Sequence, residues 1–224
     1  METEVLCLRP AADFIRAGLQ PPTRFTVTYR APDDRDVAAL MRNAGALIMP
    51  AVGPVLDPSL FADSALRLVQ VTGAGVDRLD AAALKRLGIP VANVPGGSNR
   101  AVAEYAVTSA SMLLRGFAHA DTELKKGNYV PFRSRLVAEN RAGLEGLVVG
   151  VIGLGIIGMA VAQTFHRMGC RICYHDEVPR PADAIAQMDA QALPLVELLR
   201  TADIVTLHVP LLPATRSLIG SAEL

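Results

Sequence analysis

The sequence has no net charge and no long apolar run. Lys plus Arg and Asp plus Glu each number 22 in 224 residues, so the formal net charge is zero. Without a basic field, the chain has no electrostatic means of holding nucleic acid or an anionic membrane surface. No stretch reaches the roughly 18 apolar residues of a membrane span, and the acidic first residues do not resemble a signal peptide. These absences favour a protein that acts on small soluble molecules.

Cysteine is scarce, with only Cys7, Cys170 and Cys173. An odd, low count argues against a disulfide framework and is typical of the reducing cytoplasm, where we expect the protein to work. Cys170 and Cys173 form a C-x-x-C, a pattern that can mark a redox or metal site. Here the pair flanks a predicted strand, on which residues i and i+3 face opposite sides, so we expect two small buried side chains. No cluster has metal-ligand spacing, and no metal site is predicted.

Short apolar runs alternate with amphipathic stretches over the first 97 residues. The predicted strands are residues 5–8, 25–29, 46–49, 66–71 and 89–93, and the predicted helices are residues 11–17, 33–41 and 80–87. Strands and helices that alternate at this spacing indicate a parallel α/β sheet. The segment Pro95-Gly96-Gly97-Ser98 breaks the pattern, so we place a domain boundary after residue 97.

A second α/β pattern occupies residues 98–224. It opens with a long predicted helix over residues 100–115, and a polar stretch from 121 to 145 then carries little regular signal. The remaining predicted strands are residues 147–152, 171–175 and 204–209, and the remaining predicted helices are residues 157–168 and 196–200.

Gly153-Leu154-Gly155-Ile156-Ile157-Gly158 forms a G-x-G-x-x-G between a predicted buried strand and a predicted helix. That context makes it a dinucleotide-binding fingerprint. Gly153 permits the tight turn, Gly155 lets a pyrophosphate approach the backbone, and Gly158 lets the helix pack closely on the strand. The phosphates would meet unpaired N–H groups at the positive end of the helix dipole. The alternative is a glycine-rich turn with no ligand.

Asp176 ends the next predicted strand, at the spacing the fingerprint requires. Its carboxylate can accept hydrogen bonds from both hydroxyls of the adenosine ribose and would repel a 2′-phosphate, which favours NAD over NADP. Arg180 is nearby but follows Pro179, and Glu177 adds negative charge.

Several segments resemble the D-isomer-specific 2-hydroxyacid dehydrogenases, in that family's order. They are residues 72–77, residues 93–96 with 99 and 101–104, the glycine fingerprint with Asp176, residues 198–211, and residues 215–220. The resemblance implies a flavodoxin-like substrate domain over residues 1–97 and a Rossmann-type NAD-binding domain over residues 98–224 whose C-terminal part is missing. It further implies an NAD-dependent oxidoreductase that acts on the CH–OH group of a small 2-hydroxy acid, reduces the 2-oxo acid in reverse, and forms a homodimer.

The resemblance also assigns roles to individual positions. Ala74 and Gly75 would bind the substrate carboxylate or the nicotinamide edge through their backbone N–H groups. The implied cofactor-binding residues are Val102 beside the nicotinamide, the fingerprint glycines Gly153, Gly155 and Gly158, Ile156 and Ile157 at the pyrophosphate, Asp176 at the ribose, and His208, Val209 and Pro210 along the cleft.

The family's catalytic residues have no counterpart in this chain. In the family, a His oriented by a Glu exchanges the hydroxyl proton and an Arg binds the carboxylate, and all three lie beyond the position that matches Leu224. We therefore expect the catalytic residues after Leu224 and the sequence to be a fragment; His208 is the one histidine that the resemblance places near the cofactor. The alternatives are a non-catalytic NAD-binding sensor or interaction module and an inactive truncated remnant.

Overall fold

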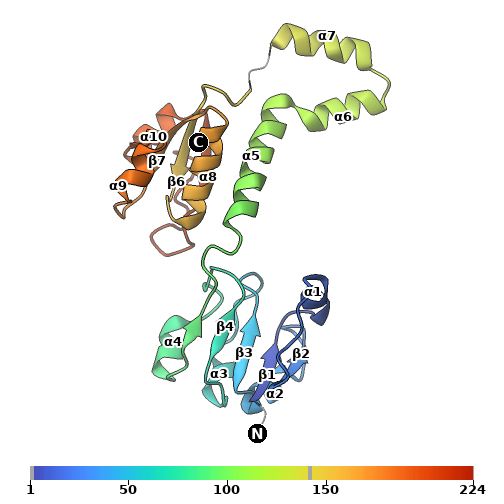
Figure 1. Cartoon of the computed structure of the whole chain (residues 1–224), viewed down its shortest axis with the longest axis vertical. Coiled ribbons are helices and arrows are strands. Elements are labelled where there is room, and N and C mark those ends of the chain that lie inside the picture. The colour runs from blue at the N-terminus through green and yellow to red at the C-terminus, as the bar shows by residue number, and fades with distance from the viewer. Residues whose placement is uncertain (1–2, 141–142, 224) are drawn as a thin grey trace. The chain divides into compact units, whose positions relative to one another are not determined.

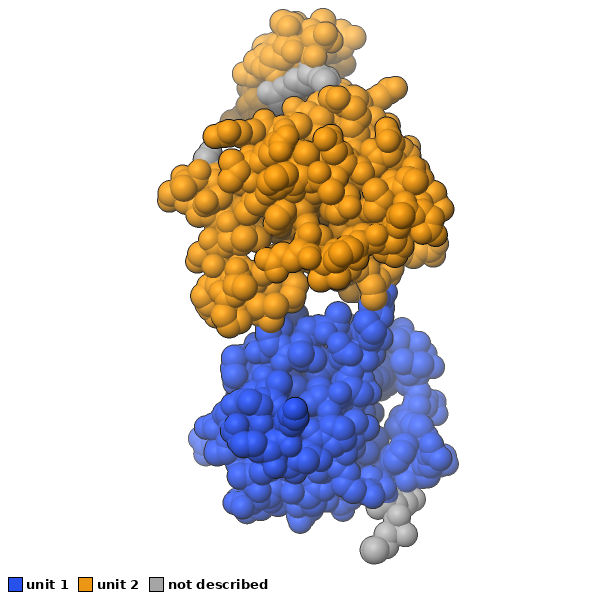
Figure 2. Space-filling model, turned by 90° about the vertical axis from the view of Figure 1, so that its left-hand side faces the viewer, with its two compact units in different colours: residues 1–97 blue, residues 98–224 orange. Residues whose placement is uncertain are grey.

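The computed structural model describes residues 3–140 and 143–223. The chain divides into two compact units, residues 1–97 and residues 98–224 (Figure 2). Each unit is built on its own parallel sheet, and the predicted parallel α/β fold is confirmed.

The first unit has a five-stranded parallel sheet in the order β2-β1-β3-β4-β5 (Figure 1). This is the strand order of flavodoxin-like folds. Its strands are β1 (Thr3–Cys7), β2 (Phe25–Tyr29), β3 (Ala46–Met49), β4 (Val69–Val71) and β5 (Val91–Ala92). Its helices are α1 (Ala11–Arg16), α2 (Val37–Asn43), α3 (Ser59–Ala62) and α4 (Ala81–Arg86).

One core holds the first unit together. Alternate residues of the three central strands, among them Leu6, Leu47 and Val69, are buried against Met41 of α2 and Leu84 of α4. The apolar residues of these strands are the signal from which the sequence predicts them.

The second unit has a four-stranded parallel sheet in the order β8-β7-β6-β9. This order corresponds to the first four strands of the usual Rossmann arrangement. Its strands are β6 (Val148–Ile152), β7 (Arg171–His175), β8 (Gln191–Ala192) and β9 (Ile204–Leu207). Its helices are α5 (Asn99–Arg115), α6 (Phe117–Lys125), α7 (Tyr129–Glu139), α8 (Ile156–Arg167), α9 (Ala182–Ala186) and α10 (Leu195–Thr201).

Small residues allow close packing around the central strand of the second unit. All five residues of β6 are buried, and a Cβ added to Gly150 would lie 2.5 Å from a methyl carbon of Leu198 and 2.9 Å from the Cβ of Ala202. On another side, α5 lies along α8 with Ala103 and Ala110 buried in the shared core (Figure 1). This packing fixes the position of α8, whose first residue, Ile156, follows shortly after the end of β6.

The structure corrects the prediction for residues 121–145. The sequence predicts little regular structure there, yet much of the stretch belongs to helices α6 and α7, which extend away from the sheet of their unit (Figure 1). No residue of α6 is buried and only Phe132 of α7 is, so neither helix shows the apolar stripe that predicts a packed helix. Local bonds support α6 instead, such as the Lys125–Asp121 pair at 2.7 Å.

Other differences are shorter or missed elements. Helix α2 begins at Val37, later than the predicted residue 33, because the acidic residues before it form turns. The predicted strand 66–71 is reduced to Val69–Val71. The short elements α3, α9 and β8 have too few residues to produce a periodic pattern, and the sequence did not predict them.

Candidate functional site

A glycine turn joins β6 to α8 at the carboxyl end of the second sheet. Gly153 has φ +88°, in the left-handed region that favours glycine, and its N–H donates to His175 O at 2.8 Å. A Cβ at Gly153 would also lie 2.9 Å from Val209 N, in the loop after β9. The turn therefore brings the ends of three parallel strands together at one point.

The other two fingerprint glycines have opposite surroundings. A Cβ at Gly158 would lie 2.0 Å from Gly153 O, so only glycine lets the first turn of α8 rest on the loop. A Cβ at Gly155 would meet no atom within 4 Å. Gly158 is thus required by packing, whereas Gly155 borders open space.

The N-terminus of α8 presents unpaired backbone donors. The hydrogen bond from Met159 N to Gly155 O, at 2.8 Å, is the first that reaches back from the helix to the loop. Ile156 N and Ile157 N have no acceptor among the described residues, and the Ile156 side chain is exposed. Free N–H groups at the start of a helix of 12 residues form a site suited to a phosphate or another anion.

Asp176 follows β7 and faces this glycine turn. Its side chain is only 7% exposed. Its Oδ2 accepts a hydrogen bond from Leu154 N at 2.6 Å, and its Oδ1 accepts one from Val178 N at 2.8 Å. The carboxylate is therefore fixed beside the glycine turn by the backbone of two different loops.

Arg180 contacts the same carboxylate. Its Nη2 and Nε lie 2.6 Å and 3.1 Å from Asp176 Oδ2. Burial raises the pKa of Asp176, but the bonds from Val178 N, Arg180 and Leu154 N outweigh it, and the pKa is lowered. The sequence places Arg180 nearby but does not predict this ion pair.

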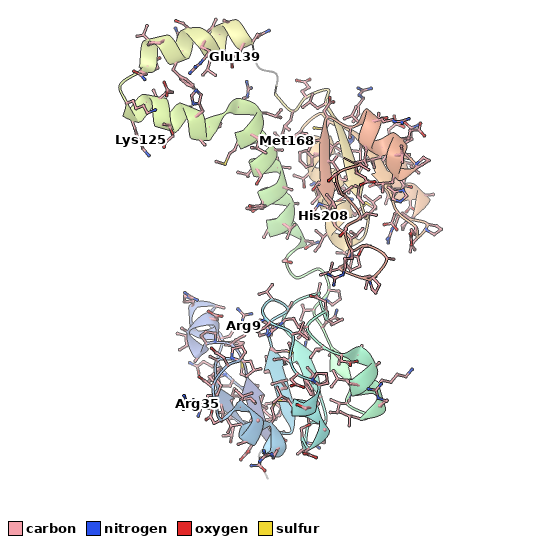
Figure 3. The ribbon with its side chains drawn as sticks, turned by 180° about the vertical axis from the view of Figure 1, so that it is seen from behind. Arg9, Arg35, Lys125, Glu139, Met168 and His208 are labelled. Atoms are coloured by element: carbon pink, nitrogen blue, oxygen red, sulfur yellow. The ribbon has the colours of Figure 1, made fainter. Side chains whose placement is uncertain are left out.

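The loop after β9 holds the remaining residues predicted to line the cofactor cleft. His208, labelled in Figure 3, is half-buried, and its Nε2 lies 2.9 Å from Thr206 Oγ1. Burial lowers the pKa of His208, which favours the neutral ring. Val209 is half-buried and Pro210 is exposed, while Val102 lies half-buried in the first turn of α5.

In the first unit, residues 72–77 form a loop after β4 that is exposed over residues 74–77. Ala74 N and Gly75 N have no acceptor among the described residues. Asn93 Nδ2 donates to Ala74 O at 2.8 Å and steadies the loop from β5. A Cβ at Gly73 would lie 2.7 Å from the Cβ of Ala51, so this glycine is held against the loop after β3. The two predicted donors are free and lie on a fixed loop.

Two arginines that the sequence analysis did not single out surround this loop. Arg78 is 2% exposed, and its guanidinium donates to Pro54 O, Pro50 O and Val52 O at 2.7 to 2.8 Å. Arg9 Nη1 donates to Thr72 Oγ1 at 3.1 Å. An isolated arginine in a sequence gives no sign of burial, because most arginines are exposed.

The C-x-x-C pair has the predicted structural role. Cys170 and Cys173 are buried, unbonded to each other, and belong to different core clusters. Among residues 3–140 and 143–223, no group of three or more His, Cys, Asp or Glu side chains could hold a metal ion. No helix in the described part of the chain combines the length and the apolar character of a membrane span.

None of the histidines in the described residues is hydrogen-bonded to a carboxylate. His119 contacts Arg135, His175 contacts Leu193 O, and His208 contacts Thr206. The described residues thus offer unpaired backbone N–H groups and a carboxylate fixed beside the glycine turn, but no oriented proton-transfer pair.

Comparison with known proteins gives this arrangement a context. The model of the "D-isomer specific 2-hydroxyacid dehydrogenase, NAD binding domain" matches residues 107–224. A glyoxylate reductase of Aeropyrum pernix is 31% identical over 198 residues, which cover 88% of this chain and 59% of that protein. D-lactate dehydrogenase kk1H of Curvularia clavata is 33% identical over 192 residues, with 84% and 53% covered.

The fold is shared with a solved structure of D-lactate dehydrogenase from Aquifex aeolicus, which was crystallised with NAD and lactic acid. It superimposes with a TM-score of 0.83 at 23% identity, covering 99% of this chain and 65% of that one. The chain therefore spans less than two thirds of the length of these relatives.

Proposed function

The chain belongs to the D-isomer-specific 2-hydroxyacid dehydrogenase family, with residues 107–224 in its NAD-binding domain, and we propose that it is part of an NAD-dependent oxidoreductase of small 2-hydroxy acids. The main support is the geometry of the glycine turn. The unpaired N–H groups of Ile156 and Ile157 follow this turn, and Leu154 N in the turn donates to the Asp176 carboxylate. These groups match the two ends of an adenosine pyrophosphate.

We propose that Ile156 and Ile157 bind the pyrophosphate and that Asp176 binds the adenosine ribose. Gly155 fits this role because a pyrophosphate can approach a backbone that has no side chain in the way. His208, Val209 and Pro210 would border the cofactor from the β9 loop, and Val102 would line the nicotinamide side. When bound, the nicotinamide supplies the hydride donor or acceptor for the interconversion of a 2-hydroxy acid and a 2-oxo acid.

The proposed substrate domain is residues 1–97, and the proposed cofactor domain is residues 98–224. Ala74 N and Gly75 N would bind the substrate carboxylate, because two exposed donors on a steadied loop suit a planar anion. The names of the relatives, glyoxylate reductase and D-lactate dehydrogenase, favour a short-chain acid.

We also propose a homodimer and a cytoplasmic location. The dimer is supported by apolar side chains on helices α5 to α7 that remain exposed, namely Tyr105, Leu113, Val130 and Val137. The location is supported by three buried, unpaired cysteines, which a reducing compartment keeps as thiols.

The first experiment is calorimetric titration of NADH into the purified 224-residue chain, beside the Asp176→Ala variant. We expect saturable binding that the substitution weakens by about tenfold or more, since two ribose hydroxyls lose a charged acceptor. A folded chain that does not bind NADH would refute the cofactor role. Turnover is tested separately, by loss of NADH absorbance with glyoxylate or pyruvate in a version extended to the length of the relatives. If the extended chain bound NADH without turnover, the protein would be a binding module.

A further inference from the structure

The chain itself supplies four hydrogen bonds to the Asp176 carboxylate. Oδ1 accepts from Val178 N, and Oδ2 accepts from Leu154 N and from two nitrogens of Arg180. A carboxylate oxygen offers about two lone-pair directions. The acceptor positions that the two ribose hydroxyls of NAD require are therefore largely occupied.

Of these donors, Arg180 is the one that can move away readily. Leu154 N and Val178 N belong to the backbone of the loops that define the site, so displacing them would remodel it. The Arg180 side chain is 24% exposed and can rotate into solvent. A ribose that binds Asp176 must therefore compete with the guanidinium, and the binding of NAD is weakened by the strength of that ion pair.

The backbone keeps Arg180 close even when the ion pair opens. Pro179 and Pro181 flank it, so its conformation is restricted by the following proline, and Pro181 is also the N-cap of α9. The guanidinium consequently stays at the ribose end of the site. There it offers a planar set of donors that matches a phosphate in geometry and charge.

The charged groups around Asp176 act in opposite directions on a 2′-phosphate. Asp176 itself and the exposed Glu177 repel a 2′-phosphate, while Arg180 attracts it. For NAD the balance is reversed, because Asp176 attracts the hydroxyls and Arg180 competes with them. A single side chain therefore works against NAD and in favour of NADP.

We propose that Arg180 is a specificity-determining residue of the cofactor site, which competes with the ribose of NAD for Asp176 and provides a cation for the 2′-phosphate of NADP. The domain then binds NADH and NADPH with similar affinity, in contrast to the strict NAD preference that Asp176 alone predicts. This inference rests on the proposed cofactor-binding function of the same site.

The test is calorimetric titration of NADH and of NADPH into the wild-type chain, Arg180→Gln, Arg180→Lys and the control Arg167→Gln. Arg167 is an exposed arginine at the far end of α8, so the control removes the same charge away from Asp176. Thermal melting verifies that each variant is folded.

We expect the wild-type dissociation constants for the two cofactors to agree within about tenfold. Arg180→Gln should tighten NADH binding about threefold to fivefold and weaken NADPH binding about tenfold, as partly exposed ion pairs and charged hydrogen bonds imply. Arg180→Lys should retain part of the NADPH affinity, and Arg167→Gln should change neither constant by more than about twofold.

Two results would overturn the inference while leaving the proposed function intact. One is an Arg180→Gln variant that weakens NADH binding, which would make the arginine a support for Asp176. The other is a wild-type preference for NADH above about a hundredfold that Arg180→Gln does not alter. A folded wild-type chain that binds neither cofactor would refute the proposed function and this inference together.

Discussion

Replacing Gly158 and Gly155 separately by alanine separates the folding role of the glycine turn from its proposed cofactor role. At Gly158 the new Cβ would lie 2.0 Å from Gly153 O, well inside the roughly 3.0 Å that Cβ contacts require. The opposing atom is a backbone carbonyl of the turn, so α8 or the turn must shift by about an ångström. At Gly155 the new Cβ would meet nothing within 4 Å.

The expected loss of stability for Gly158→Ala follows from two opposing terms. Alanine gains about 1 kcal/mol over glycine within a helix. Overpacking typically costs about 1–3 kcal/mol and occasionally more. A Cβ only 2.0 Å from a backbone oxygen places Gly158→Ala at the upper end, at about 3 kcal/mol or more. The net loss is then at least about 2 kcal/mol, equivalent to roughly 6 °C or more in the melting temperature of a unit of this size. Gly155 has φ −71° and ψ −162°, which alanine adopts without strain, so Gly155→Ala should change stability by less than about 0.5 kcal/mol.

The assay is thermal melting of both variants together with calorimetric titration of NADH. Gly155→Ala should keep the wild-type melting temperature and lose about tenfold or more in NADH affinity, because its methyl group stands where the pyrophosphate approaches. Gly158→Ala should melt early whether or not NADH is present. The reasoning is refuted if Gly158→Ala melts with the wild type, or if Gly155→Ala binds NADH as tightly as the wild type does.

Three further predictions concern other sites. Arg78→Gln should destabilise the chain by about 2–4 kcal/mol in urea unfolding, because a buried guanidinium loses its bonds to three loop carbonyls, whereas the exposed control Arg35→Gln should change stability by less than about 0.5 kcal/mol. Burial lowers the pKa of His208 in the folded state, so on acidification the ring is protonated in the unfolded chain at a higher pH than in the folded chain. The contribution of the neutral His208 to stability is therefore complete above about pH 6.5 and is lost as the pH falls toward the folded-state pKa. The melting temperature of the wild type should therefore fall more between about pH 7 and pH 5 than that of His208→Gln, and equal slopes would contradict the assignment. Burial raises the pKa of all three cysteine thiols, so a thiol reagent should label them rapidly only after unfolding, and rapid labelling of the native chain would contradict their burial.

The strands and the main helices could be predicted because burial leaves a pattern in the sequence. The apolar run of β6 corresponds to a strand in which all five residues are buried, and the run of β3 corresponds to a strand with alternate residues buried. The α8 pattern corresponds to a helix with one buried side. Helices α6 and α7 were not predicted because almost none of their residues are buried. Phe132 is their one buried side chain, so local bonds rather than a core specify them.

The part of the candidate site that is formed by the glycine turn could be predicted from the sequence. The part that depends on contacts between side chains could not. The spacing of the fingerprint and Asp176 follows from the chain geometry of a strand, turn and helix. The contact between Arg180 and Asp176 depends on the path of the intervening loop, which contains Pro179 and no periodic signal. The burial of Arg78 depends in the same way on where the loop after β3 places its carbonyl groups.

Gly150, three residues before the glycine fingerprint, is also required by close packing. Its missing side chain makes room for Leu198 and Ala202, which come from α10 and the residue that follows it. Read from Gly150 to Gly158, the pattern is G-x-x-G-x-G-x-x-G, in which Gly150, Gly153 and Gly158 permit close contacts with α10, with the β9 loop and with the turn itself. A genome search with the longer pattern would therefore select for a tertiary arrangement of four elements, and not only for a phosphate-binding turn.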